Sequence, residues 1–171
     1  MKPTQFIDNY FNVEKLGGLL ISLIGITAFF GASYFLFFAA APDLFYKGMA
    51  WPLLIVAFVQ VGVGVFIYWR SPRDIKRVET YFHTQPDKLI TDELPRIKKV
   101  FKDFVFYVRI QVTLCVVGVF MIIFTHSTSD LLMGIGVGLL VQGGIMLMFD
   151  YLAERRAGEY CRSLEQAIEQ L

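Results

Sequence analysis

The stretch FVFYVRIQVTLCVVGVF, residues 104–120, decides the class of fold, because it is an almost unbroken apolar run with a single charge, Arg109. A run of about 20 apolar residues is long enough to cross the hydrocarbon core of a bilayer as a helix. The whole chain has the same character: it is 56% hydrophobic and only 18% charged, with a mean hydropathy of +0.55. A soluble domain is about half apolar and about a quarter charged. The sequence therefore predicts an integral membrane protein.

Four apolar runs are each long enough to span a bilayer, where only helices or closed barrels satisfy every backbone polar group. The predicted transmembrane helices cover residues 16–41, 52–69, 104–124 and 131–151. We therefore expect an all-α integral membrane protein whose residues 1–171 form one domain. Helical segments at 71–103 and 152–171 are expected to extend spans 3 and 4 into a small cytoplasmic helical bundle.

The basic residues outside the predicted spans indicate the orientation of the chain. Two lysines precede the first span, nine Lys and Arg residues lie in residues 70–103, and three arginines lie in the tail. The opposite side carries Lys47 alone. Because short cytoplasmic loops hold the excess of Lys and Arg, we expect both termini in the cytoplasm of a multi-pass plasma-membrane protein, or of a bacterial inner-membrane protein if the source is bacterial.

Helix signals divide the cytoplasmic segment in two. Ser71-Pro72-Arg73-Asp74 combines a capping serine, a proline and a carboxylate in the order typical of a helix start, and Gln85-Pro86-Asp87 predicts a break. After the break, apolar residues recur in steps of three and four into the third span, at Leu94, Ile97, Phe101, Phe104 and Val108. This spacing predicts one continuous helix from about Thr91 to Phe124. Ser129, just before the fourth span, is among the predicted capping residues of that helix.

Two further segments, the tail and the N-terminus, carry amphipathic stripes at helical spacing. The tail has apolar residues at helical spacing, including Ala157, Cys161 and Leu164, and we expect it to pack against residues 70–103. At the N-terminus, Phe6, Ile7, Tyr10 and Phe11 share one face. Two alternatives are open for this segment: an amphipathic helix lying on the membrane surface, or a frayed terminus.

Residues that commonly carry catalysis or bind metals are scarce. The two histidines, His83 and His126, fall on opposite sides of the predicted membrane, and the common zinc, nucleophile and phosphate-loop motifs are missing from the sequence. We therefore expect no enzyme activity, no metal and no cofactor. The 16 basic residues are nearly matched by 15 acidic ones and are not pooled, so nucleic acid is not an expected partner.

Glycines at helical spacing mark faces where a second helix can approach closely. Gly18 and Gly25 lie seven residues apart in the first span, and Gly134 and Gly138 lie four apart in the fourth. These faces predict either packing between helices of this chain or an interface with a partner.

The polar residues predicted within the membrane include three amides: Gln60, Gln111 and Gln142. A buried amide needs a hydrogen-bond partner, and Gln60 and Gln142 lie at similar predicted depths. We expect them to bond across helices, with a pore or ligand lining as the alternative.

Arg109 lies five residues inside a membrane edge at Phe104, about 7 Å deep. Asp150 lies in the same inner layer, and we expect the two to form an ion pair. The alternative is an anion site formed by Arg109 with Arg70.

The predicted function is binding rather than chemistry. The four-span topology is similar to that of several tetraspan groups, among them small immunity-type membrane proteins that protect against pore-forming toxins, and the similarity concerns topology alone. We expect a non-enzymatic membrane protein with an accessory, regulatory or immunity-type role. Its partners would be the lipid bilayer and another membrane or cytoplasmic protein. The alternative is a homo-oligomeric channel or transporter for ions or small solutes, in which the fourth span packs between copies of the chain.

Overall fold

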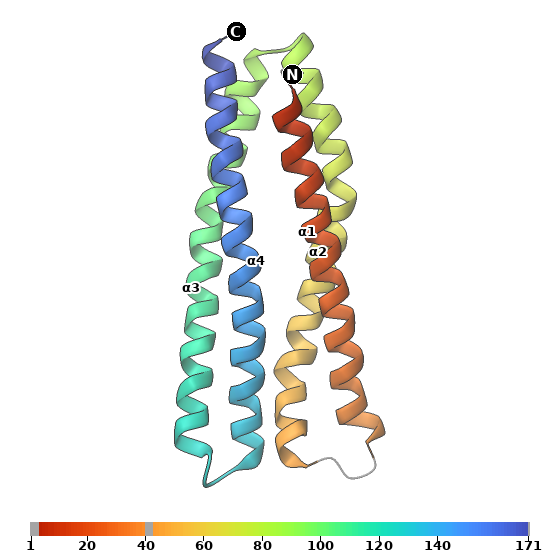
Figure 1. Cartoon of the computed structure of the whole chain (residues 1–171), viewed down its shortest axis with the longest axis vertical. Coiled ribbons are helices and arrows are strands. Elements are labelled where there is room, and N and C mark those ends of the chain that lie inside the picture. Colours follow the sequence, from red (N-terminus) through yellow and green to blue (C-terminus); the bar gives the residue numbers. More distant parts are fainter. Residues whose placement is uncertain (1–3, 40–42, 171) are drawn as a thin grey trace.

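Four long helices run side by side along the molecule in the computed structural model, which describes residues 4–39 and 43–170 (Figure 1). They are α1 (Gln5–Ser33), α2 (Leu44–Thr84), α3 (Leu94–Thr125) and α4 (Asp130–Glu169). Two π-helical turns extend them: η1 (Tyr34–Phe38) follows α1, and η2 (Leu89–Glu93) leads directly into α3. The described residues contain no strand, and all four helices are long and apolar enough to cross a membrane. The predicted all-α class with four apolar helices is therefore confirmed.

The helices pack in the order α1, α2, α4, α3, each mainly against its neighbour in that row. Figure 1 shows both ends of the chain at one end of the molecule, together with the connection between α2 and α3. This end is called the termini end below. The end of η1, the start of α2 and the connection between α3 and α4 lie at the other end, called the turn end. Helix α3 has α4 as its main neighbour, so most of the surface of α3 faces outward.

Helix α2 differs from the sequence prediction at both of its prolines. The helix begins at Leu44 and not at Pro52, and it continues through Pro72 to Thr84 without the predicted new start at Ser71. The Ser71 hydroxyl donates a hydrogen bond to the carbonyl of Ile67, 2.8 Å away, instead of capping a new helix. Because α2 is already helical before Ser71, the helix has no free N–H groups at this point for a cap to satisfy. The continuous helix therefore overrides the local start signal.

The predicted break and the continuous helix into the third span are confirmed. The chain leaves the helix at Gln85 and Pro86 and then stays helical through η2 and α3 to Thr125. The first helix differs from the predicted span 16–41, because α1 begins at Gln5 and η1 ends at Phe38. Ser129 caps α4, because its side-chain oxygen accepts a hydrogen bond from the backbone N–H of Leu132 at 3.4 Å.

Glycines on α1 and α4 allow helices of the same chain to approach closely. A Cβ atom at Gly18 or Gly25 would meet residues of α2 at about 3 Å or less. A Cβ atom at Gly134 would overlap the carbonyl of Phe45, and one at Gly138 would lie 2.7 Å from the carbonyl of Met49. The glycine faces are thus occupied by α2 of this chain, which decides the open alternative in favour of packing within the chain.

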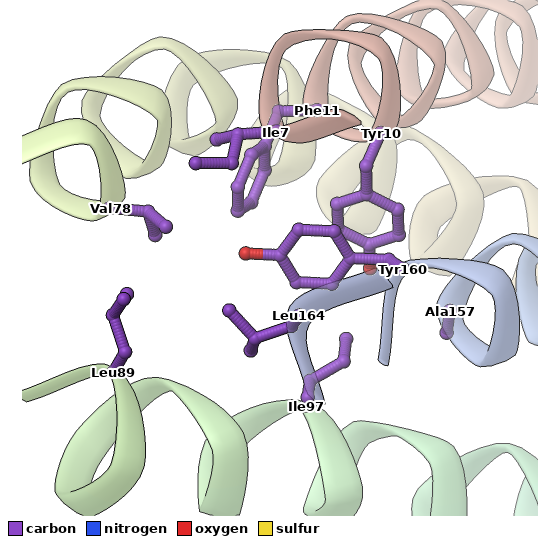
Figure 2. Close-up of a cluster of buried hydrophobic side chains, with 9 residues drawn as sticks. All are labelled: Ile7, Tyr10, Phe11, Val78, Leu89, Ile97, Ala157, Tyr160 and Leu164. Atoms are coloured by element: carbon purple, nitrogen blue, oxygen red, sulfur yellow. The ribbon is translucent and has the colours of Figure 1, made fainter. Parts of the chain in front are cut away.

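A cluster of buried apolar side chains joins all four helices at the termini end (Figure 2). Tyr160 lies at its centre and stacks on Tyr10, with ring centroids 4.3 Å apart. The cluster comprises Ile7, Tyr10, Phe11, Val78, Leu89, Ile97, Ala157, Tyr160 and Leu164. The tail therefore packs against residues 70–103 as predicted. Both predictions for the N-terminal segment are wrong, because Ile7 and Phe11 are fully buried in this cluster.

Replacing Gly134 by alanine is expected to lower the free energy of unfolding by about 1–3 kcal/mol, because the added methyl group would overlap backbone that has no room to move. Unfolding of the purified protein in detergent measures this change. The matched control is Gly144→Ala on the same helix, where a Cβ atom meets nothing within 4 Å. Equal stability of the two variants would contradict the close α2–α4 approach.

Candidate functional site

A buried carboxylate, Glu93, is the centre of a network of charges at the termini end. Its side chain is 1% exposed. Arg96 donates two hydrogen bonds to it, at 2.9 and 2.6 Å, and Arg77 donates a third at 3.3 Å. The hydroxyl of Tyr160 donates a fourth at 3.0 Å. These donors belong to α3, α2 and α4, so a single carboxylate connects three helices.

The network continues along α2 to the N-terminal helix. Asp74, also buried, lies 2.9 Å from Arg77, and Arg70 Nε lies 3.0 Å from it in an ionic contact without hydrogen-bond alignment. Arg70 in turn donates a 2.8 Å hydrogen bond to Glu14 of α1. Three carboxylates and three guanidinium groups therefore alternate across the bundle, which offsets the cost of removing each charge from water.

Burial and neighbouring charges shift the pKa values of three groups of this network. Burial raises the pKa of the Tyr160 phenol and the negative charge of Glu93 raises it further, so the hydroxyl remains a donor. Burial by itself would lower the pKa of Arg96, but its hydrogen bonds to Glu93 outweigh this and raise it. Burial raises the pKa of Glu14 against the opposing charge of Arg70. Such a network can hold helices in register.

The sequence contained a partial signal for this network. Asp74 lies four residues after Arg70 and three before Arg77, which are spacings that bring side chains together on one helix face. The cross-helix contacts of Glu93 with Arg77 and Tyr160 have no such local signal. Arg70 was a predicted site residue, as part of the alternative anion site, whereas Glu14 and Glu93 were not predicted.

The predicted ion pair between Arg109 and Asp150 is wrong. Asp150 accepts a short hydrogen bond from Gln111 instead, and Arg109 is exposed and makes no ion pair with any described residue. Two residues of α-helix turn a side chain by about 200°, so Gln111 faces α4 and Arg109 faces away from it. The alternative anion site is also wrong. The guanidinium of Arg70 is paired with Glu14 and Asp74. Arg70 also belongs to α2, which does not pack against α3.

The predicted bond between Gln60 and Gln142 is confirmed. The Gln60 amide donates to the Gln142 carbonyl oxygen at 3.2 Å, and the sulfur of Met146 lies 3.4 Å from the same nitrogen. Both glutamines are buried between α2 and α4. Their amides therefore link two helices, as expected for the structural alternative.

The histidines, cysteines and carboxylates of the described residues are not gathered into a metal site. The described residues hold no group of three or more His, Cys, Asp or Glu side chains placed to bind a metal ion. His83 and His126 lie near opposite ends of the bundle, and Cys115 and Cys161 are free thiols on different helices. Comparison with protein-family models, curated proteins and solved structures finds no match for this chain.

Replacing Glu93 by alanine is expected to lower the free energy of unfolding by about 3 kcal/mol, at the low end for breaking a buried ion pair, because Arg77 and Arg96 retain some contact with water. Chemical unfolding in detergent measures the loss. Glu159→Ala is the control: it removes an exposed pair with Arg155 and should change stability by no more than about 0.5 kcal/mol. Losses of equal size would mean that Glu93 contributes no more than a surface pair.

Gln111→Ala is expected to cost about 1–2 kcal/mol of stability, because it leaves the half-buried Asp150 without its donor. Arg109→Ala should change stability by less than about 0.5 kcal/mol when the protein is in a detergent without anionic lipid. Thermal unfolding of the two variants side by side tests this ranking. The opposite ranking would favour the ion pair between Arg109 and Asp150 over the hydrogen bond from Gln111.

Proposed function

We propose that this protein is a non-enzymatic, multi-pass membrane protein that acts by binding another protein through its cytoplasmic bundle. The cytoplasmic bundle consists of residues 5–15 of α1, 71–84 of α2, 89–103 of η2 and α3, and 152–169 of α4. The excess of Lys and Arg at the termini end supports placing this bundle in the cytoplasm and the apolar parts of the four helices in the plasma membrane.

The observation that carries the proposal is the rigid connection between the membrane part and the bundle. Helices α2 and α4 continue from their apolar windows into the bundle without a break, and α3 enters the membrane as part of the same helix. The Glu93 network and the apolar cluster then join all four segments. A surface held in one conformation loses little entropy when a partner binds, which favours a role in recognition.

The tip of the bundle is the surface best placed for a protein partner. Ile90, in the π-helical turn η2, is 51% exposed, and Asp87, Lys88 and Asp92 around it are exposed as well. Fourteen residues separate Ile90 from the predicted membrane edge at Phe104, which corresponds to about 20 Å of helix. Lipid does not reach this position, so its apolar side chain is available to a membrane or cytoplasmic protein.

The packing of the fourth helix weighs against the homo-oligomeric channel or transporter. Gly134 and Gly138, the expected contacts between copies, already pack against α2 of the same chain. Gln60 and Gln142 are bonded to each other in the interior.

A photo-crosslinking amino acid at Ile90 is expected to give one discrete protein adduct in native membranes, because the tip faces the partner. The matched control is the same amino acid at Ile123, which is 58% exposed on the apolar part of α3 and should give none. Lys88→Glu should weaken the Ile90 adduct by changing the charge beside it. Failure to form an adduct at Ile90 contradicts the proposal, and solute flux through liposomes containing the purified protein would favour the channel.

A further inference from the structure

A groove opens between α3 and α4 where both helices leave their predicted spans. Its volume is about 670 Å³. Two lysines of α3 and two arginines of α4 line it, together with exposed aromatic rings on both helices. The lining residues that matter here are Lys98, Lys102, Arg155, Arg162, Phe101 and Tyr151.

Positive charge in this groove is only partly neutralised. Lys98 pairs with Glu165 at 2.8 Å, and Arg155 pairs with Glu159 at 3.3 Å, both on the exposed surface. Lys102 and Arg162 form no ion pair with any of the residues that the structure describes. Glu154 is the acidic residue in the lining, so the groove retains a surplus of cations.

The floor of the groove is open because of a glycine. A Cβ atom at Gly158 would meet only the ring of Phe101, at 3.6 Å, which is an ordinary contact. A side chain there would fill space and would not disturb the packing. Gly158 therefore leaves open the space between the basic side chains of α3 and those of α4.

The depth of the groove matches the headgroup layer of a bilayer. Tyr151, 62% exposed, ends the fourth predicted span, and Arg155 lies about 6 Å beyond it. Lys102 lies about 3 Å beyond the start of the third predicted span at Phe104. The headgroup layer of one leaflet is about 5–7 Å thick, so both cations fall within it. Exposed tyrosines are common at this depth.

We infer that this groove binds the headgroup of an anionic phospholipid of the cytoplasmic leaflet. Lys102 and Arg155 contact its phosphate, and the acyl chains lie along the exposed apolar surface of α3. The inference rests on the membrane placement in the proposed function but not on a protein partner. Lipid binding is measured on the purified protein alone, so it can fail while crosslinking at Ile90 succeeds, and the reverse.

Native mass spectrometry of the full chain in neutral detergent tests the site. We expect one molecule of phosphatidylglycerol to be retained in preference to phosphatidylcholine. The double variant Lys102→Gln with Arg155→Gln should retain it about 25-fold more weakly, because each cation near a membrane surface contributes roughly fivefold. The matched control removes two exposed cations of α2, with Arg73→Gln and Lys76→Gln, and should bind as the unaltered protein does.

A second variant keeps the charges but fills the groove. Gly158→Leu should fold, since only the Phe101 ring lies near, and should still lose the lipid. Three results would overturn the inference: equal losses in the two double variants, retention of the lipid by Gly158→Leu, or equally strong binding of soluble glycerol 3-phosphate. Displacement of the lipid by an acidic peptide with higher affinity would assign the groove to a protein instead.

Discussion

The desolvation of Glu93 is the constraint on which the termini end of the molecule depends. An ionised carboxylate that is 1% exposed costs several kcal/mol to remove from water, and this cost is offset only when its donors are in place. The donors Arg77, Arg96 and Tyr160 come from three different helices. A shift of one helix along another would leave a buried charge unpaired, so the network holds the helices in a single register.

The apolar part of the molecule depends on a different interaction. Lipid surrounds a helix as favourably as another apolar helix does, so association in a membrane needs close packing and hydrogen bonds. Gly134 and Gly138 bring α4 against α2, and the Gln60–Gln142 bond lies in the same interface. Helix α3 is held mainly by α4, and most of its apolar surface faces outward.

In the proposed membrane placement, the molecule has two candidate binding surfaces at its termini end. The tip around Ile90 would lie beyond the reach of lipid, whereas the cationic groove between α3 and α4 would lie at headgroup depth. A lipid in the groove would contact both walls and thereby steady α3, the helix with the fewest protein neighbours. Protein recognition at the tip and lipid binding at the groove are therefore compatible in one molecule.

Local and periodic features were determined by the sequence alone: the four apolar helices, the continuous helix into span three, the Ser129 cap and the depth that pairs Gln60 with Gln142. Hydrophobicity, helical period and distance along an axis are properties of one segment at a time. Tertiary structure decided the rest. It carried α2 through Ser71 and Pro72, and it buried the N-terminal stripe. It also placed Asp150 in a hydrogen bond with Gln111 and not in an ion pair with Arg109. Each of these outcomes depends on how a helix is rotated toward its neighbours, and that rotation is set by packing between segments far apart in the chain.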